Sequence, residues 1–221
     1  MISTQNAPDP AHSISRYYRD SALAEQFLVR MRPFICPFAP LVEWVSPGSS
    51  VLDIGCGGGM WLLTLAESGR LSNGSGCDIN RRALAQAKLA AQHYTKSGGI
   101  AKLDFLYAPT IADWPTTDQF DVVSLIDVLH HVPPEIQTEF VKQALKRLKP
   151  GGRLIYKDMA CTPNWVALGN RIHDLVIARQ WIHYLPIEQV VEVITQAGGS
   201  VLHRQNWRRL FYSHELLVVG T

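Results

Sequence analysis

The stretch VLDIGCGGGMW, from Val51 to Trp61, places four glycines within five residues, directly after a short apolar run that carries Asp53. Glycine weakens the interior of a strand or helix, so a glycine cluster indicates a special local requirement. One such requirement is a tight strand-to-helix turn with positive φ angles. The other is a ligand that approaches the backbone so closely that a Cβ atom would collide with it. Four glycines after an acid favour the ligand.

Strand-like and helix-like segments alternate along the chain beyond this stretch. Short, almost continuously apolar runs such as FDVVSLI are typical of parallel strands that are covered on both faces. The alternation predicts an α/β fold with a doubly wound parallel sheet. We expect strands at 51–54, 74–79, 103–108, 120–126 and 153–159, and helices at 60–68, 81–96, 133–149 and 187–199.

The pattern changes at both ends of the chain. Residues 1–14 are interpreted as a flexible tail, followed by a single domain over 15–221 that starts with an N-terminal helical cap at 15–45. A helical insertion is expected at 162–185, after the fifth strand. The chain closes with two strands joined by a short link, which makes them antiparallel neighbours. These strands are expected at 200–212 and 213–221.

The composition argues against several classes of protein. The formal net charge of +2 is too close to neutral to indicate a nucleic-acid partner. No apolar run approaches the length of a membrane span, and the sequence MISTQNAPDPAHS lacks the layout of a signal peptide. The four cysteines form no CxxC pair, so no metal site is expected. These features predict a cytoplasmic protein.

The glycine-rich turn also indicates the kind of ligand. Ligands of open parallel sheets lie beyond the carboxyl ends of the strands. The dinucleotide fingerprint G-x-G-x-x-G would need a third glycine at position 60, where the chain has Met60. Asp53 would repel a pyrophosphate but suits an ammonium group, and Asp78 ends the second strand, where an acid can accept both ribose hydroxyls. S-adenosylmethionine, a nucleoside with a cationic amino-acid end and no phosphate, meets these requirements.

Four motifs follow one another along the chain, namely VLDIGCGGG, the acid Asp78, FDVVSLIDVLHHV and LKRLKPGGRLIYKD. In this order they resemble the class I S-adenosylmethionine-dependent methyltransferases of the small-molecule type. The resemblance implies a Rossmann-like, seven-stranded sheet whose last strand is antiparallel. It also implies that Asp78 binds the ribose and that its neighbour Ile79 belongs to the cofactor site. The residues implied to lie along the methionine end are Asp53, Gly55, Cys56, Gly57 and Gly59. Asp127, after the fourth strand, is expected to lend its backbone to the amino end of the ligand rather than to take part in proton transfer.

The chain departs from this family at the position that contacts the adenine amine. Many members carry an acid shortly after the third strand, whereas Thr110 of LYAPTIADWP aligns with that position. Thr110 can still form a hydrogen bond, and Ile111 can pack on the adenine ring. In a different register, Asp113 is the acid.

Methyl transfer asks little of side chains, because the sulfonium already makes the methyl group electrophilic. Alignment and exclusion of water can supply most of the catalysis, and a base is needed only for a protonated acceptor. Candidates follow the fourth and fifth strands. We hypothesise that His131 is the general base, with His130 as the alternative. Asp158 is interpreted either as a group that orients a histidine or binds the acceptor, or as a turn cap.

The insertion NWVALGNRIHDLVIARQWIHYLP has an aromatic and imidazole content that is unusual for a linker. Insertions at this place in the family commonly cover the acceptor. The segment also has a faint resemblance to methyltransferases of bacterial polyene-pigment and polyketide pathways. The residues expected to form a lid over an aromatic or acyl-carrier-tethered acceptor are Trp165, His173, Trp181, His183 and Tyr184, with Tyr17 and Tyr18.

The sequence thus predicts a methyltransferase that acts at oxygen or carbon of a small or carrier-tethered acceptor, in secondary metabolism. Two alternatives stay open. One is a NAD-dependent oxidoreductase on a related sheet, against which Met60 and the antiparallel end of the chain count. The other is a protein that binds the cofactor without turnover.

Overall fold

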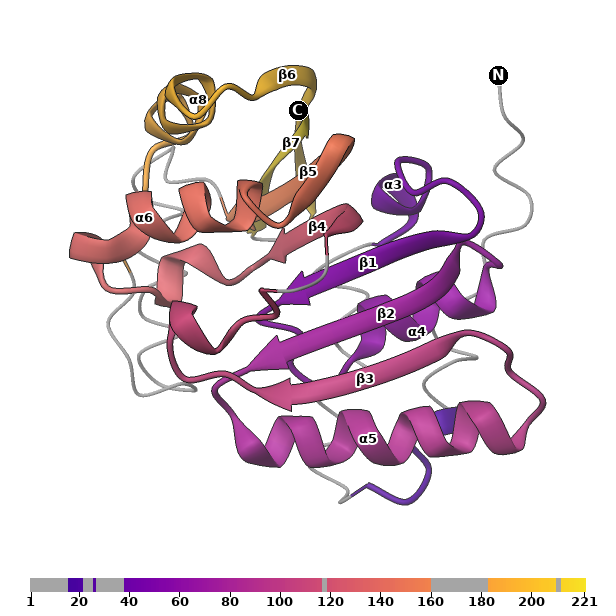
Figure 1. The fold of residues 1–221 in the computed structure, drawn as a ribbon. Helices are drawn as coiled ribbons and strands as arrows, with labels where there is room; N and C mark the ends of the chain where they lie inside the picture. Colours follow the sequence, from indigo (N-terminus) through magenta and orange to yellow (C-terminus); the bar gives the residue numbers. More distant parts are fainter. Residues whose placement is uncertain (1–15, 22–25, 27–37, 117–118, 160–182, 210–211) are drawn as a thin grey trace. The chain divides into compact units, whose positions relative to one another are not determined.

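The computed structural model describes residues 16–21, 26, 38–116, 119–159, 183–209 and 212–221. It is an α/β protein with a seven-stranded mixed sheet, which confirms the predicted fold class (Figure 1). The chain forms two compact units, Met1–Trp114 and Pro115–Thr221. The first unit holds the strands in the order β3-β2-β1, and the second holds them in the order β4-β5-β7-β6.

The first unit consists of parallel strands joined by helices. Pairing aligns the carboxyl ends of its strands, since Ile54 lies opposite Cys77 and Asp78 lies opposite Tyr107. Figure 1 shows helix α5 running along strand β3. The elements are α3 (Ala39–Val42), β1 (Ser49–Ile54), α4 (Met60–Glu67), β2 (Leu71–Asp78), α5 (Arg81–Lys96), β3 (Lys102–Tyr107) and the 3-10 turn η2 (Ile111–Asp113).

The sequences of α4 and α5 explain how these two helices form and pack. The side-chain oxygen of Asn80 caps α5, because it accepts hydrogen bonds from the amides of Arg82 and Ala83. Helix α4 is buried along seven of its eight residues, so it packs as a fully apolar helix. Helix α5 is amphipathic, and its buried face consists of Leu84, Ala87, Ala90, Ala91, His93 and Tyr94.

The second unit ends in antiparallel strands, as the sequence predicts. Strand β7 pairs antiparallel with both β5 and β6. The C-terminal half of β7 is fully buried between them, from Leu216 to Val219. The elements are β4 (Phe120–Ile126), the 3-10 turn η3 (Leu129–His131), α6 (Pro134–Leu145), β5 (Leu148–Met159), α8 (Ile187–Gln196), β6 (Ser200–Arg209) and β7 (Tyr212–Gly220).

The boundary between α6 and β5 differs from the prediction. The sequence predicts a helix to residue 149 and a strand from residue 153, but α6 ends at Leu145 and β5 begins at Leu148. Leu148 pairs with Phe120, after which the register of the two strands shifts. The residues around Pro150 therefore form an irregular part of the strand, and strand pairing prevails over the helix propensity of LKRLK.

The structure describes only residues 16–21 and 26 of the predicted N-terminal helix, and Gln26 is helical. Arg16 and Tyr17 are helical, but residues 18–21 form bends and turns. The reason is burial, because the side chains of Tyr17 and Tyr18 are each 1% exposed and a straight helix would present them in different directions. The predicted tail at 1–14, most of the segment at 15–37 and residues 162–182 of the predicted insertion lie outside the described residues.

Within the described part of the chain, no helix combines the length and apolarity that crossing a bilayer requires.

Candidate functional site

The glycine-rich loop joins β1 to α4 in the first unit. Gly55, Gly57 and Gly59 have φ angles of 78°, 51° and 77°, which other residues rarely adopt. A Cβ atom at Gly59 would lie 2.7 Å from the ring of Phe105, whereas one at Gly57 would meet nothing within 4 Å. Gly59 is therefore needed for packing against β3. Gly57 leaves open space, where a ligand can approach the backbone.

Asp78, at the end of β2, is bound to the glycine loop. Its Oδ2 atom accepts a hydrogen bond of 2.7 Å from the amide of Gly57, and its Oδ1 atom accepts one of 2.7 Å from the amide of Asn80. A carboxylate has about four lone-pair sites, so these two contacts leave acceptor capacity for further donors. The structure thus brings together two parts of the predicted cofactor site that are 21 residues apart.

Two further predicted residues of this site, in strand β1 and in the loop itself, are buried. Asp53 is 2% exposed and Cys56 is 8% exposed. Burial raises the pKa of the Cys56 thiol, and the nearby Asp53, Asp78 and Cys77 raise it further. The thiol is therefore neutral and serves as packing, while Asp53 places a carboxylate at the carboxyl end of β1.

Three side chains lie close to Asp78, namely Ile79, Arg81 and Tyr107. Ile79 is 69% exposed, which is unusual for a large apolar side chain and leaves it available to a flat ligand. The Arg81 guanidinium lies 3.5 Å from the centroid of the Tyr107 ring, so a cation–π contact fixes these two side chains next to Asp78.

The two candidates for the adenine contact lie together. The amide and the hydroxyl of Thr110 both donate to the Asp113 carboxylate, at 3.0 and 2.7 Å. This capping box starts η2, which carries Ile111. The two residues proposed to contact the adenine amine, Thr110 and Asp113, therefore belong to one polar cluster.

The second unit carries a buried ion pair at the carboxyl ends of β4 and β5. The ammonium of Lys157 lies 2.6 Å from a carboxylate oxygen of Asp127, and the two side chains are 0% and 8% exposed. Asp127 is the only residue other than glycine with a positive φ in the described part of the chain, at 51°. Its amide also donates to the carbonyl of Lys157 at 2.8 Å. Lys157 therefore holds the turn after β4 in a conformation that costs free energy.

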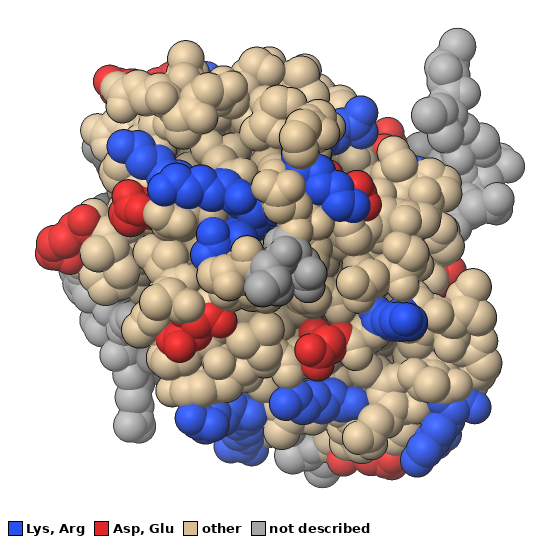
Figure 2. Space-filling model, viewed as in Figure 1, with Lys and Arg blue, Asp and Glu red and all other residues tan. Residues whose placement is uncertain are grey.

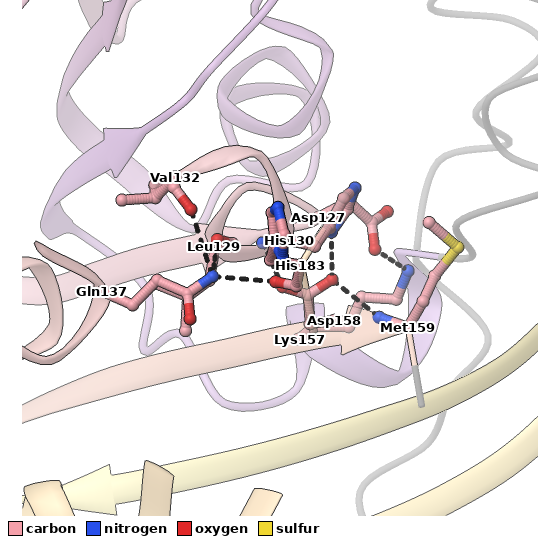
Figure 3. A network of polar contacts seen from close by, with 9 residues as sticks. All are labelled: Asp127, Leu129, His130, Val132, Gln137, Lys157, Asp158, Met159 and His183. Carbon is pink, nitrogen blue, oxygen red and sulfur yellow. Dashed lines mark hydrogen bonds and ion pairs between the residues drawn. The ribbon is translucent and has the colours of Figure 1, made fainter. Parts of the chain in front are cut away.

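A histidine and an aspartate form the centre of the polar network in Figure 3. His130 Nδ1 lies 2.5 Å from Asp158 Oδ1, and the two side chains are 2% and 5% exposed. The amide of His130 donates to the other carboxylate oxygen at 3.3 Å. Because a carboxylate only accepts, Nδ1 carries the proton, and a neutral His130 then has its lone pair on Nε2. Such a histidine is oriented and charge-stabilised for proton transfer.

Neighbouring groups support this pair. The His131 and Tyr184 rings lie 4.1 and 5.8 Å from the His130 ring, between centroids. Gln137 is buried, and its side-chain amide donates to the carbonyls of Leu129, Val132 and His183. The network therefore ties α6 and the segment before α8 to the η3 turn (Figure 3).

A second buried carboxyl group lies next to Asp158 on the neighbouring strand. Glu215 of β7 is paired with Asp158 of β5 and is 7% exposed. Burial raises the pKa of the Glu215 carboxyl, Asp158 and Glu188 raise it further, and Arg204 lowers it. Arg204 also donates to Glu188 at 2.7 Å.

The predicted cofactor residues other than Asp127 lie in the first unit, and the catalytic candidates lie with Asp127 in the second unit. The structure joins Asp158 to His130, whereas the sequence hypothesis preferred His131. Of the predicted acceptor lid, Trp165, His173 and Trp181 lie outside the described residues. Tyr17 and Tyr18 are buried within the first unit. Sequence reasoning missed Tyr18 as a contact of the glycine loop, Gln137 and Glu215. The available sequence signal for Glu215 was a charged residue directly before the apolar run LLVV of β7.

No group of three or more histidine, cysteine, aspartate or glutamate side chains that could hold a metal ion occurs within the ranges that the structure describes.

Comparisons with known proteins relate both the sequence and the fold to one family. Residues 8–204 match a family model described as a methyltransferase domain. The ubiquinone biosynthesis O-methyltransferase of Idiomarina loihiensis is 35% identical over 112 residues, which make up 51% of this chain and 43% of that protein. The matched stretch thus spans about half the length of the curated relatives.

Solved structures share the fold at low sequence identity. Magnesium protoporphyrin IX methyltransferase from Synechocystis PCC 6803 with bound SAH has a TM-score of 0.69 and 20% identity, over 95% of this chain and 93% of that chain. A SAM-dependent methyltransferase from Methanosarcina mazei has a TM-score of 0.65 and 19% identity, over 82% and 96% of the two chains.

Proposed function

Because the chain belongs to the methyltransferase domain family, we propose that it transfers a methyl group from S-adenosylmethionine to a small-molecule acceptor. The observation that carries this proposal is the hydrogen bond between the Gly57 amide and Asp78. It brings the loop after β1 together with the acid at the end of β2. A ligand that has both an amino-acid end and a ribose needs these two features side by side.

The residues of the first unit fit this cofactor. Asp78 has acceptor capacity left for ribose hydroxyls, and Gly57 leaves its backbone open to a ligand. The Asp53 carboxylate favours a cationic amino-acid end. Ile79 offers an exposed apolar surface to an aromatic base, and the Thr110–Asp113 cluster offers polar contacts to its amine. In the proposed assignment, Gly55, Cys56, Gly59 and Ile111 complete the cofactor-binding set of this unit. Asp127, in the second unit, stays a prediction from the sequence.

The cofactor supplies an electrophilic methyl group, so the chain has to align the acceptor and, for a hydroxyl acceptor, remove its proton. We assign proton removal to Nε2 of His130. Its partner Asp158 fixes the tautomer and stabilises the imidazolium that forms. The contact with Asp158 favours His130 over His131, whose ring packs against His130. Asp158 is then a residue that orients the base.

An oxygen atom of the acceptor is the proposed site of methylation. A base that is paired with a carboxylate suits a hydroxyl acceptor. The curated relative from Idiomarina loihiensis is also named an O-methyltransferase. Methylation at carbon is the second candidate. An aromatic or carrier-tethered acceptor, a role in secondary metabolism and a cytoplasmic location are predictions from the sequence that complete this proposal.

Calorimetric titration of the purified protein with S-adenosylhomocysteine and with NAD tests the cofactor class. We expect heat of binding with S-adenosylhomocysteine only, because Asp53 and Met60 disfavour a pyrophosphate. Heat with NAD alone would contradict the proposed cofactor and favour the oxidoreductase instead. A screen of phenolic and acyl-carrier acceptors with methyl-labelled cofactor then tests turnover. Binding without any labelled product across the screen would favour the protein that binds cofactor without turnover.

A further inference from the structure

The segment Arg16–Ser21 contacts the glycine loop and the helices of the first unit in a way that the proposed function does not use. The Tyr17 and Tyr18 side chains are each 1% exposed, although their segment is not part of a long helix. Two adjacent tyrosines with fully buried rings need partners for both hydroxyls. The two hydroxyls find different partners.

The Tyr18 hydroxyl binds the loop itself. It donates to the carbonyl of Gly58 at 2.5 Å, and the Tyr18 ring lies 3.7 Å from the place that a Cβ atom of Gly58 would take. Burial raises the pKa of the Tyr18 phenol, so its hydroxyl stays protonated and remains a donor.

Both polar groups of the peptide unit that Tyr18 contacts are hydrogen-bonded. The carbonyl of Gly58 and the amide of Gly59 belong to one planar peptide. The carbonyl accepts from Tyr18, and the amide of Gly59 donates to the carbonyl of Cys56 at 2.9 Å. Two residues before Gly59, the amide of Gly57 donates to Asp78. Three successive glycines have the greatest backbone freedom of any sequence, so these contacts decide which conformation the loop keeps.

Tyr17 anchors the same segment elsewhere. Its hydroxyl donates to Glu67 of α4, its carbonyl lies 2.9 Å from His93 Nδ1 of α5, and its ring packs edge-on against Tyr94. His93 Nε2 also lies 3.1 Å from Asp20. These contacts hold the segment on the helices without touching the loop.

We infer that Tyr18 is a positioning residue for cofactor binding, because its hydroxyl fixes the Gly58–Gly59 peptide of the loop while Tyr17 fixes the segment that carries it. This role rests on the proposed function, since the loop has to be the place where S-adenosylmethionine binds. Tyr18 acts on cofactor affinity through the loop and does not take part in methyl transfer.

The test compares Tyr18→Phe with Tyr17→Phe, which remove one buried hydroxyl each and keep both rings. Calorimetry with S-adenosylhomocysteine should show a dissociation constant about 3- to 10-fold higher for Tyr18→Phe, as the loss of one hydrogen bond implies. We expect the constant for Tyr17→Phe to stay within about twofold of wild type, with a lower thermal midpoint. With an accepted substrate, Tyr18→Phe should raise KM for the cofactor and leave kcat unchanged.

Hydrogen exchange provides a readout that does not need a ligand. The Gly59 amide should exchange faster in Tyr18→Phe than in Tyr17→Phe, because only Tyr18 fixes that peptide. Equal affinities of wild type and Tyr18→Phe, or an equal loss in both variants, would overturn the role of Tyr18. A wild-type protein that does not bind S-adenosylhomocysteine would instead overturn the proposed function, and the role of Tyr18 with it.

Discussion

Lys157→Met should destabilise the protein strongly, since it removes the cation of a buried ion pair and keeps an unbranched side chain that is one atom shorter. The Lys157 ammonium is 2.6 Å from Asp127, and the two side chains are 0% and 8% exposed. The variant leaves the Asp127 carboxylate buried without this partner. Breaking a buried pair in this way costs about 3–5 kcal/mol. Such a loss is a large share of the roughly 5–15 kcal/mol by which folded proteins are stable.

Lys149→Met is a matched control on the same strand. Lys149 is paired with Asp121 at 2.8 Å, but the two side chains are 44% and 41% exposed. Exposed pairs contribute about 0–1 kcal/mol, so this variant should unfold nearly as wild type does. Urea unfolding followed by circular dichroism gives the free energy of unfolding for both variants.

The double variant Lys157→Met/Asp127→Asn distinguishes the buried charge from lost packing. Asparagine tolerates the positive φ of position 127 and carries no charge, so it should recover at least half of the lost stability. Equal losses for Lys157→Met and Lys149→Met, or no recovery in the double variant, would refute the reasoning that burial makes this pair essential.

Three further predictions concern the loop, the base and the second buried carboxyl group. Gly59→Ala should cost more stability than Gly48→Ala, because both positions have a φ of 77° but only a Cβ at position 59 would lie 2.7 Å from an aromatic ring; equal urea midpoints would contradict this. With an accepted hydroxyl substrate, His130→Ala should lower kcat by about 100-fold or more with little change in the KM for cofactor, and a greater loss in His131→Ala would assign the base to His131. Glu215→Gln should stabilise the protein at pH 7, because burial raises the pKa of this carboxyl and native stability therefore falls as pH rises through its titration. The gain in stability should vanish below about pH 4, where this carboxyl is protonated in the unfolded chain as well. If Glu215→Gln instead loses stability at pH 7, the interaction with Arg204 makes the charged carboxylate favourable.

The sequence predicts most of this fold because local signals and tertiary contacts agree. The helix 81–96 is found with the predicted bounds, since Asn80 is a strong cap and the apolar residues have helical spacing. The strand 120–126 is equally well predicted, because a continuous apolar run fits a buried strand. At the start of β5 the sequence misleads, because pairing of Leu148 with Phe120 depends on residues far apart in the chain.

The site is predictable in part for the same reason. Spacing within the motif marks Gly57, and position at a strand end marks Asp78, but only the fold shows that the two are hydrogen-bonded. Nothing local distinguishes His130 from His131, and the choice depends on which ring meets Asp158, 28 residues away. Tyr18 is 40 residues from Gly58, so its contact with the loop had no sequence signal.

A crystal structure of the protein grown with S-adenosylhomocysteine tests the central claim most directly. We predict the nucleoside at the carboxyl ends of β1 and β2, with its ribose hydroxyls on the Asp78 carboxylate and its amino-acid end along the loop at Gly57. Density for the nucleoside at another place, or a loop that stays empty at saturating ligand, would contradict the account.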